Sequence, residues 1–304
     1  MRSILSAGGT GMTRSLSAAF ALMTLSLVAC GEADGPPPVS ERGDISSERP
    51  AVLDLWEAGI PAFGVFVPDE RPADERGPDG ERLPAIYTAE GGEALARNPL
   101  YDYLFLNLEG RYEVSAVEAM VMGVRRSGVS SPPAVLVRIP PMSEDGEDVT
   151  RERVHEILAL GADGVVLPHI RTPEEAETAA GFFQEAGADV WSPGNRGGRT
   201  IVMLMLEDPE SVARAAEFAQ VPGYSLLACG IGSLTSAMGG DREGAEAWNL
   251  HVLEEATAAG LPDMITANAN NVEERLEQGF LALLMAGPNA DDVIRTGRAL
   301  AGRE

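Results

Sequence analysis

The sequence contains no lysine, because all 23 of its basic residues are arginine. This absence excludes mechanisms that need a lysine amine: a Schiff base with substrate, a pyridoxal-phosphate linkage or the lysine of a phosphate-binding P-loop. Positive charge is scarce overall, since 47 acidic residues give a net charge of −24. Such a chain is repelled by phosphates, so we expect neither nucleic acid nor anionic membrane surfaces among its partners.

Cysteine, histidine and aromatic residues are also few. The sequence has two cysteines, three histidines and 5% aromatic residues. This scarcity argues against a structural zinc site. Cys229 closes an apolar stretch, where a small core residue is expected rather than a nucleophile. With 44% hydrophobic residues, the chain can form an aliphatic core for one large domain or two small ones.

Residues 1–29 have the features of a secretory signal peptide. Arginines without acidic residues precede an apolar run that is too short to span a bilayer. The run ends in Leu27-Val28-Ala29-Cys30, which resembles the lipobox of bacterial lipoproteins. We therefore expect lipidation at Cys30, a flexible tether over residues 30–50, and an extracytoplasmic location on a bacterial membrane, at the periplasmic face or the cell surface. The alternative is an ordinary secretory signal with an incidental cysteine.

From residue 51 onward, short aliphatic runs alternate with longer amphipathic stretches. The aliphatic runs are continuous, as in parallel strands that are buried on both faces. Eight strands, each followed by a helix over about 250 residues, predict an α/β fold, a (β/α)8 or TIM barrel, for residues 51–304. An open doubly wound sheet is the rival, but the sequence lacks its glycine-rich nucleotide turn. The predicted strands are Ala62–Val67, Tyr103–Leu108, Ala134–Ile139, Gly164–Leu167, Ile201–Leu206, Tyr224–Ala228, Met264–Ala267 and Leu281–Met285.

Capping residues mark the starts of several helices. Thr172–Glu175 and Asp208–Glu210 each place a cap directly before proline and acidic residues. Asn271 and Asn289 are expected to open the last two helices in the same way. The charged segment 69–97, rich in proline and glycine, predicts an extended loop at the barrel mouth.

Functional groups of such a barrel belong at the carboxyl ends of the strands. Glu207 ends an apolar strand, where a carboxylate is costly unless it is paired or metal-bound. It is therefore a site residue or the partner of Arg138 in a buried salt bridge. His169 is a candidate base or nitrogen ligand; the alternative is a hydrogen-bonded histidine under the strand 4 loop. Glu109 is a replacement ligand or a partner of Arg138 or Arg111.

The loop after the sixth strand contains Gly232 and Ser233. If a helix starts there, their backbone amides can bind an anion. The alternative is that the Ser233 side chain simply caps the helix.

The order and spacing of these segments resemble the metal-dependent 2-dehydro-3-deoxyglucarate and 4-hydroxy-2-oxoheptanedioate aldolases, relatives of the citrate lyase β subunit. The similarity covers most of residues 51–304. It rests on collinear segments: Arg138–Pro141, GADGVVLPHIRTPEEAE, Pro193–Gly197, Glu207, the loop before Met238, and GF…GPNADDVIRTGRALA.

The resemblance implies a barrel of the phosphoenolpyruvate/pyruvate-binding type and a carbon–carbon lyase that acts on a 2-oxo acid or another small carboxylate. A divalent cation, Mg²⁺ or Mn²⁺, would be held by Glu207, and Arg138 would stabilise the enolate oxygen. The amides of Gly232 and Ser233 would hold the substrate carboxylate. The resemblance also implies trimers or hexamers that assemble through the last helix, about residues 291–302.

Three charged or titratable positions of the family pattern are lost. The second metal ligand, an aspartate, falls on Ser233, the catalytic histidine on Gly110, and its aspartate partner on Asn107. His169 is the candidate replacement for the lost catalytic histidine. We therefore expect an altered metal site, and two functions stay open: a metal-dependent lyase, or a pseudoenzyme that binds a small carboxylate outside the cytoplasm. A barrel that works only through its surface is a third possibility.

Overall fold

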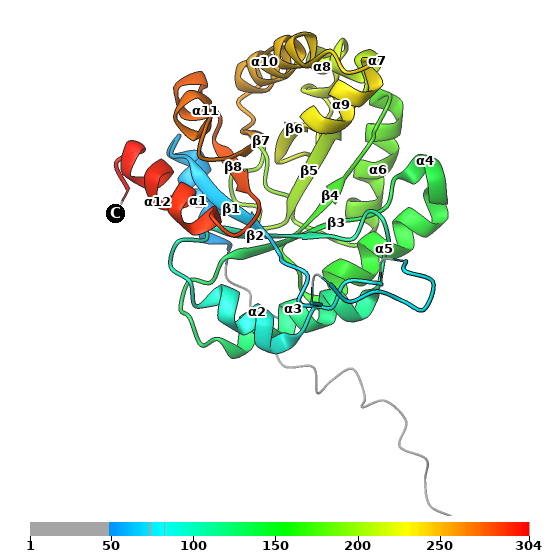
Figure 1. Cartoon of the computed structure of the whole chain (residues 1–304). Coiled ribbons are helices and arrows are strands. Elements are labelled where there is room, and N and C mark those ends of the chain that lie inside the picture. The colour runs from blue at the N-terminus through cyan, green and yellow to red at the C-terminus, as the bar shows by residue number, and fades with distance from the viewer. Residues whose placement is uncertain (1–48, 73, 82, 304) are drawn as a thin grey trace, which may run out of the picture. The chain divides into compact units, whose positions relative to one another are not determined.

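Eight parallel strands form a closed barrel surrounded by helices (Figure 1). The computed structural model describes residues 49–72, 74–81 and 83–303. Neighbours in the barrel follow the chain order, and β8 pairs with β1 to close it. The predicted (β/α)8 architecture is therefore confirmed. The strands are β1 (Ala62–Phe66), β2 (Tyr103–Asn107), β3 (Ala134–Arg138), β4 (Gly164–Leu167), β5 (Ile201–Leu206), β6 (Leu226–Cys229), β7 (Asp263–Ala267) and β8 (Ala282–Met285).

Every predicted strand matches an observed one, and the largest difference is at β6. The prediction placed its start at Tyr224, whereas the strand runs from Leu226 to Cys229. Tyr224 instead lies in the preceding loop, where its hydroxyl donates a hydrogen bond to the carbonyl of Ala176, at 2.6 Å. The hydroxyl of Tyr224 thus links the loop before β6 to the helix that contains Ala176, residues Pro173–Glu185.

One helix precedes the barrel and the others follow its strands. The helices are α1 (Ala51–Glu57), α2 (Ala89–Ala96), α3 (Val114–Arg126), α4 (Met142–Asp145), α5 (Glu147–Leu160), α6 (Pro173–Glu185), α7 (Pro209–Val212), α8 (Ala215–Phe218), α9 (Ile231–Ala237), α10 (Arg242–Ala258), α11 (Val272–Gln278) and α12 (Ala290–Leu300). Within these residues no helix is both long and apolar enough to cross a membrane.

Two of the four expected caps are present. The side chains of Thr172 and Asp208 accept hydrogen bonds from backbone N–H groups in the first turns of α6 and α7. The prediction is wrong for Asn271 and Asn289, which precede α11 and α12 but make no side-chain cap bond. The side-chain Oδ1 of Asn271 instead accepts a hydrogen bond from the backbone N–H of Asn268 in the preceding loop.

The loop between β1 and α2 is shorter than predicted. It ends at Thr88, whose hydroxyl caps α2 by accepting a hydrogen bond from the N–H of Gly91. Residues 89–96 are therefore helical, so the predicted loop over 69–97 is wrong in its last part. The expected signal peptide, the lipidated Cys30 and most of the tether lie outside the described residues.

The apolar side chains form two layers. One fills the barrel interior, and the other packs between the strands and the helices. Val52, Leu53 and Trp56 of α1 belong to the interior layer, and the indole N–H of Trp56 donates to the carbonyl of Leu281 just before β8. The helix α1 therefore closes the amino-terminal end of the barrel and leaves the carboxyl end for the site.

Candidate functional site

Four polar side chains meet at the carboxyl end of the barrel. Arg138 is the last residue of β3, and Glu207 follows β5 directly. Glu109 and His169 lie two residues beyond β2 and β4. Because all eight strands are parallel, their carboxyl ends converge on one mouth, and residues far apart in the sequence become neighbours.

Arg138 links the two carboxylates. Its Nη2 lies 3.0 Å and 3.2 Å from the two carboxylate oxygens of Glu207. The same nitrogen lies 2.6 Å from Oε1 of Glu109. Glu207 is only 2% exposed, so its charge depends on these partners rather than on water. The salt bridge between Glu207 and Arg138 that the sequence offered as an alternative is present, and so is the pairing of Glu109 with Arg138.

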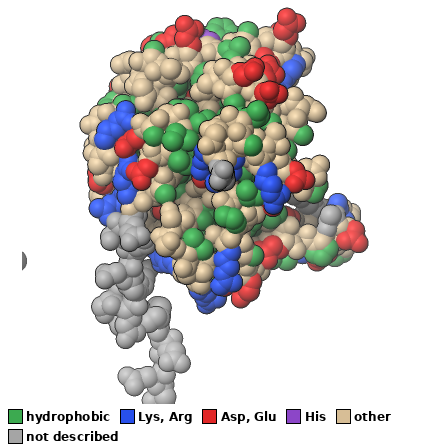
Figure 2. All heavy atoms as spheres, turned by 90° about the vertical axis from the view of Figure 1, so that its left-hand side faces the viewer, with side chains coloured by type: hydrophobic (Ala, Val, Ile, Leu, Met, Phe, Trp, Pro, Cys, Tyr) green, Lys and Arg blue, Asp and Glu red, His purple; other side chains and the backbone are tan. Residues whose placement is uncertain are grey.

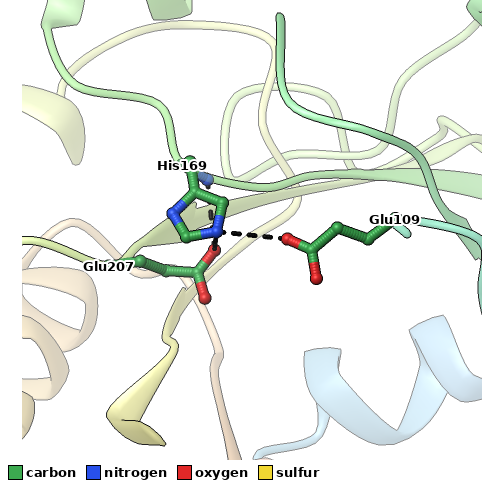
Figure 3. A group of neighbouring side chains, drawn as sticks. All are labelled: Glu109, His169 and Glu207. Atoms are coloured by element: carbon green, nitrogen blue, oxygen red, sulfur yellow. Dashed lines mark hydrogen bonds and ion pairs between the residues drawn. The ribbon is translucent and has the colours of Figure 1, made fainter. Parts of the chain in front are cut away.

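His169 joins the same group from the other side (Figure 3). Its Nε2 lies 3.1 Å from Glu109 Oε1 and 3.5 Å from Glu207 Oε2. Its backbone N–H also donates to Glu207 Oε2, at 3.1 Å. The sequence left open that His169 is a hydrogen-bonded histidine under the loop after the fourth strand. His169 is hydrogen-bonded, but its partners are carboxylates at the mouth of the barrel.

These contacts shift two pKa values. The hydrogen bond to Glu109 is the largest influence on His169 and raises the pKa of its imidazole above the ordinary value, against the effect of burial. Burial is the largest single influence on Glu109 and raises its pKa. The hydrogen bond from His169 and the charges of Arg138 and His169 outweigh it, and the pKa of Glu109 falls below its ordinary value.

A cavity of about 250 Å³ lies beside this group. Arg138, Glu207, Gly232 and Ser233 line it, together with an apolar floor from the barrel interior. The helix α9 begins at Ile231, so Ser233 lies in its first turn and does not cap it. The capping alternative is therefore wrong, and both Gly232 and Ser233 line this cavity beside Glu207.

Gly230 makes room for Glu207, which the sequence did not reveal. A Cβ at position 230 would lie 2.1 Å from Oε1 of Glu207. The missing side chain therefore forms part of the cradle for the carboxylate. A glycine directly after an apolar strand was the available signal.

Gly110 and Asn107, where the resemblance expects a histidine and an aspartate, line a neighbouring cavity of about 550 Å³. The carboxamide of Asn107 accepts a hydrogen bond from the N–H of Glu109, at 3.3 Å. Nothing lies within 4 Å of a Cβ built on Gly110. Neither position supplies a titratable group to the site.

The residues present fit a divalent cation. One potential ligand atom from each of Glu109, His169 and Glu207 lies within 4.8 Å of the other two. Two carboxylates and one imidazole are common ligands of divalent metals. When His169 is neutral, the two carboxylates and the one guanidinium of Arg138 leave the group with a net negative charge, which a cation can neutralise. Gly230 has no side chain, so there is also free space beside Glu207.

A sequence profile of the family described as HpcH/HpaI aldolase/citrate lyase matches residues 115–287. That span includes Arg138, His169 and Glu207, whereas Glu109 precedes it. No curated protein sequence shows a significant match to the chain.

Solved structures share the fold. An HpcH/HpaI aldolase/citrate lyase family protein from Burkholderia cenocepacia J2315 is 18% identical, with a TM-score of 0.60 over 82% of this chain and 97% of that chain. An HpcH/HpaI aldolase from Desulfitobacterium hafniense is 19% identical, with a TM-score of 0.58 over 82% and 95% of the two chains.

A third structure is a citrate lyase β subunit from M. tuberculosis in complex with oxaloacetate and magnesium. It is 18% identical, with a TM-score of 0.51 over 80% of this chain and 98% of that chain. At these identities the likeness concerns the fold alone.

Proposed function

Because the chain belongs to the HpcH/HpaI aldolase/citrate lyase family, we propose that it is a carbon–carbon lyase that cleaves a small 2-oxo acid with a divalent cation. The observation that carries this proposal is the buried pair of Arg138 and Glu207 beside the 250 Å³ cavity. A 2-oxo acid offers two adjacent oxygens, one on the keto group and one on the carboxylate. The relative from M. tuberculosis, in complex with oxaloacetate and magnesium, supports this substrate class.

Arg138 has a donor for which the described protein supplies no acceptor. Its Nε is buried and has no hydrogen-bond partner among the residues described. Such a donor is costly unless a ligand or water satisfies it. An oxygen that becomes negative during cleavage is a suitable acceptor, and Arg138 therefore stabilises the enolate oxygen.

The remaining groups position the substrate. Glu207 is the ligand for the cation, which supplies Lewis-acid polarisation of the keto oxygen when bound. Gly232 and Ser233 line the cavity, and their backbone amides hold the substrate carboxylate. The apolar floor excludes water and strengthens these interactions.

The family's catalytic histidine and its aspartate partner are replaced by Gly110 and Asn107, and this loss determines which carbon–carbon bond is cleaved most readily. Cleavage of a 4-hydroxy-2-oxo acid needs a group that accepts the hydroxyl proton. Gly110 and Asn107 offer none, and Nε2 of the replacement candidate His169 is engaged by Glu109 and Glu207. Decarboxylation of a 2-oxo acid with a second carboxylate next to its methylene group needs no such base. The bond to the carboxylate breaks, its electron pair passes into the enolate, carbon dioxide leaves, and a proton from water then restores the oxo acid. We therefore propose oxaloacetate decarboxylation ahead of aldol cleavage.

The test is a turnover assay of the full chain with oxaloacetate and with a 4-hydroxy-2-oxo acid, each with Mg²⁺ or Mn²⁺. We expect pyruvate from oxaloacetate at a higher rate than from the hydroxy acid. Arg138→Ala should reduce turnover by about two orders of magnitude. Arg97→Ala removes an exposed arginine that pairs with Glu93 of α2 and should leave turnover unchanged. No turnover above background with either metal would overturn the proposal.

A non-catalytic binder of small carboxylates is the second candidate. The observation in its favour is the absence of a titratable side chain at Gly110 and Asn107. In that case calorimetry detects binding of pyruvate or oxaloacetate, Arg138→Ala abolishes it, and no product forms.

We also propose that the protein is lipid-anchored outside the cytoplasm through Cys30 and assembles as a homo-oligomer. The lipobox-like sequence and the family resemblance support these statements. Labelling with a radioactive fatty acid should mark the full chain but not Cys30→Ser, and light scattering should give a mass of three or six chains.

A further inference from the structure

We propose that the metal site has three protein ligands, Glu109, His169 and Glu207, and is selective for a transition ion such as Mn²⁺ over Mg²⁺. The inference rests on the proposed function for the premise that this mouth takes a divalent cation. It assigns His169 to the metal rather than to proton transfer. It also places two ligands on loops that the family resemblance gives no metal role.

The separations of the ligand atoms suit one coordination sphere. Nε2 of His169 lies 3.1 Å from Glu109 Oε1 and 3.5 Å from Glu207 Oε2. Ligands bound at about 2.1 Å to the same ion lie roughly 3.0–3.4 Å from each other when they are adjacent. Nη2 of Arg138 lies 2.6 Å from the same Glu109 Oε1 and 3.0 Å from Glu207 Oε2, and it also contacts Glu207 Oε1 at 3.2 Å. Sharing an ion therefore requires small adjustments of the three side chains, in which Arg138 releases the two ligand oxygens and keeps its bond to Glu207 Oε1.

The charge of the group also fits. With His169 neutral, as a ligand must be, two carboxylates and one guanidinium leave a net charge of −1. A divalent cation changes this charge to +1, and a substrate carboxylate then neutralises the site. Ser233 cannot supply the anionic oxygen of the expected aspartate, so Glu109 provides the second negative ligand.

The backbone of His169 indicates that its position is enforced. Among the residues that the structure describes, it is the one non-glycine residue with a positive φ, at 53°. This left-handed conformation is unfavourable for residues with a Cβ and recurs at functional sites. The bond from its N–H to Glu207 holds the loop so that the imidazole points between the carboxylates (Figure 3).

The imidazole ligand predicts the choice of metal. Mg²⁺ prefers oxygen ligands in octahedral geometry and releases its water reluctantly. Mn²⁺ binds more tightly to mixed nitrogen and oxygen ligands. We therefore expect the full chain to bind one Mn²⁺ at least tenfold more tightly than Mg²⁺.

The experiment is a titration of metal-free full chain with Mn²⁺, followed by the electron spin resonance signal of free Mn²⁺. Pulsed measurements on the bound ion then detect hyperfine coupling to imidazole nitrogen. We expect this coupling in the wild type. His169→Asn, which tolerates the left-handed backbone, should abolish it and weaken binding at least tenfold. Glu109→Gln should weaken binding similarly, and His251→Gln on α10 is the matched control without effect.

The outcomes separate this inference from the proposed function. Absence of nitrogen coupling in the wild type, or coupling that survives in His169→Asn, overturns the ligand set. Equal Mn²⁺ affinity in wild type and Glu109→Gln also overturns it. Nitrogen coupling without turnover of oxaloacetate overturns the proposed lyase and leaves the ligand set in place. Thermal unfolding of each variant verifies that the barrel is intact.

Discussion

At the scale of single residues, Gly230 determines whether Glu207 fits beneath the mouth. Gly230→Ala should weaken cation binding at least tenfold, because its Cβ would lie 2.1 Å from the carboxylate of Glu207. Displacing a buried group in this way destabilises a protein by about 1–3 kcal/mol. The φ of Gly230 is −74°, so backbone strain does not explain a loss.

The measurement for Gly230→Ala is Mn²⁺ affinity together with urea unfolding. Gly181→Ala in α6 is the matched control, because nothing lies within 4 Å of its added Cβ. It should leave metal affinity unchanged and stability unchanged or slightly higher. Wild-type metal affinity in Gly230→Ala would show that Glu207 does not depend on the space beside it.

Single residues also show which contacts of the site could be predicted from the sequence. Arg138 and Glu207 could be predicted as neighbours, because charged residues at the ends of apolar parallel strands must share one mouth. The contact of His169 with Glu109 could not, because it depends on loop conformation. The left-handed backbone of His169 could not be predicted either, because histidine adopts this conformation only occasionally. The alternative that Ser233 caps a helix was wrong, because α9 begins before it at Ile231.

At the scale of elements, α1 holds the amino-terminal end of the barrel closed. Trp56 is 4% exposed and packs with Tyr103 and Trp191, at ring-centroid distances of 6.4 Å and 6.2 Å. Trp56→Ala should lower the free energy of unfolding by about 3–5 kcal/mol, because it removes a large buried ring. Ala51→Ser, an exposed change in the same helix, should alter it by less than about 0.5 kcal/mol. The midpoint of urea unfolding measures both.

If Trp56→Ala unfolds at the wild-type urea concentration, α1 does not contribute to the barrel. Metal affinity provides a second test of position. Trp56 lies at the end opposite Glu207, so the folded variant should bind Mn²⁺ as the wild type does.

The elements themselves differ in how far the sequence predicted them. All eight strands were predicted because each is a continuous apolar run, which few other buried elements produce. The helix α1 was missed because it has seven residues and its apolar positions join the barrel interior rather than the outer layer. The whole of α2 was missed, because its two glycines favour a loop in sequence-based reasoning.

At the scale of the whole molecule, a buried carboxyl makes stability depend on pH. Asp263 is 1% exposed at the start of β7, and burial raises its pKa from 3.8 to about 8. The folded protein therefore keeps a proton that the unfolded chain loses. Between these two pKa values, the contribution of Asp263 to stability falls as pH rises.

Asp263→Asn removes this titration while keeping the shape of the side chain. The stability of the variant relative to wild type should therefore rise between pH 5 and pH 9, by more than about 1 kcal/mol. Chemical denaturation at the two pH values measures the difference. A constant difference would mean that Asp263 does not retain its proton in the folded state.

The distribution of charge on the surface reflects the excess of acidic residues in the sequence. The net charge of −24 is distributed, and on the described part of the face in Figure 2 arginines lie among acidic and apolar side chains.

The closed barrel connects the mouth to the integrity of the entire sheet. Glu109, Arg138, His169 and Glu207 each follow or end a different strand, and every strand is held by two neighbours. If the hydrogen bonds between β1 and β8 were broken, the barrel would open and these four residues would no longer be held close together. A metal ion and a ligand bound at the mouth should therefore stabilise the closed barrel. Protease digestion of the chain should be slower when both are supplied.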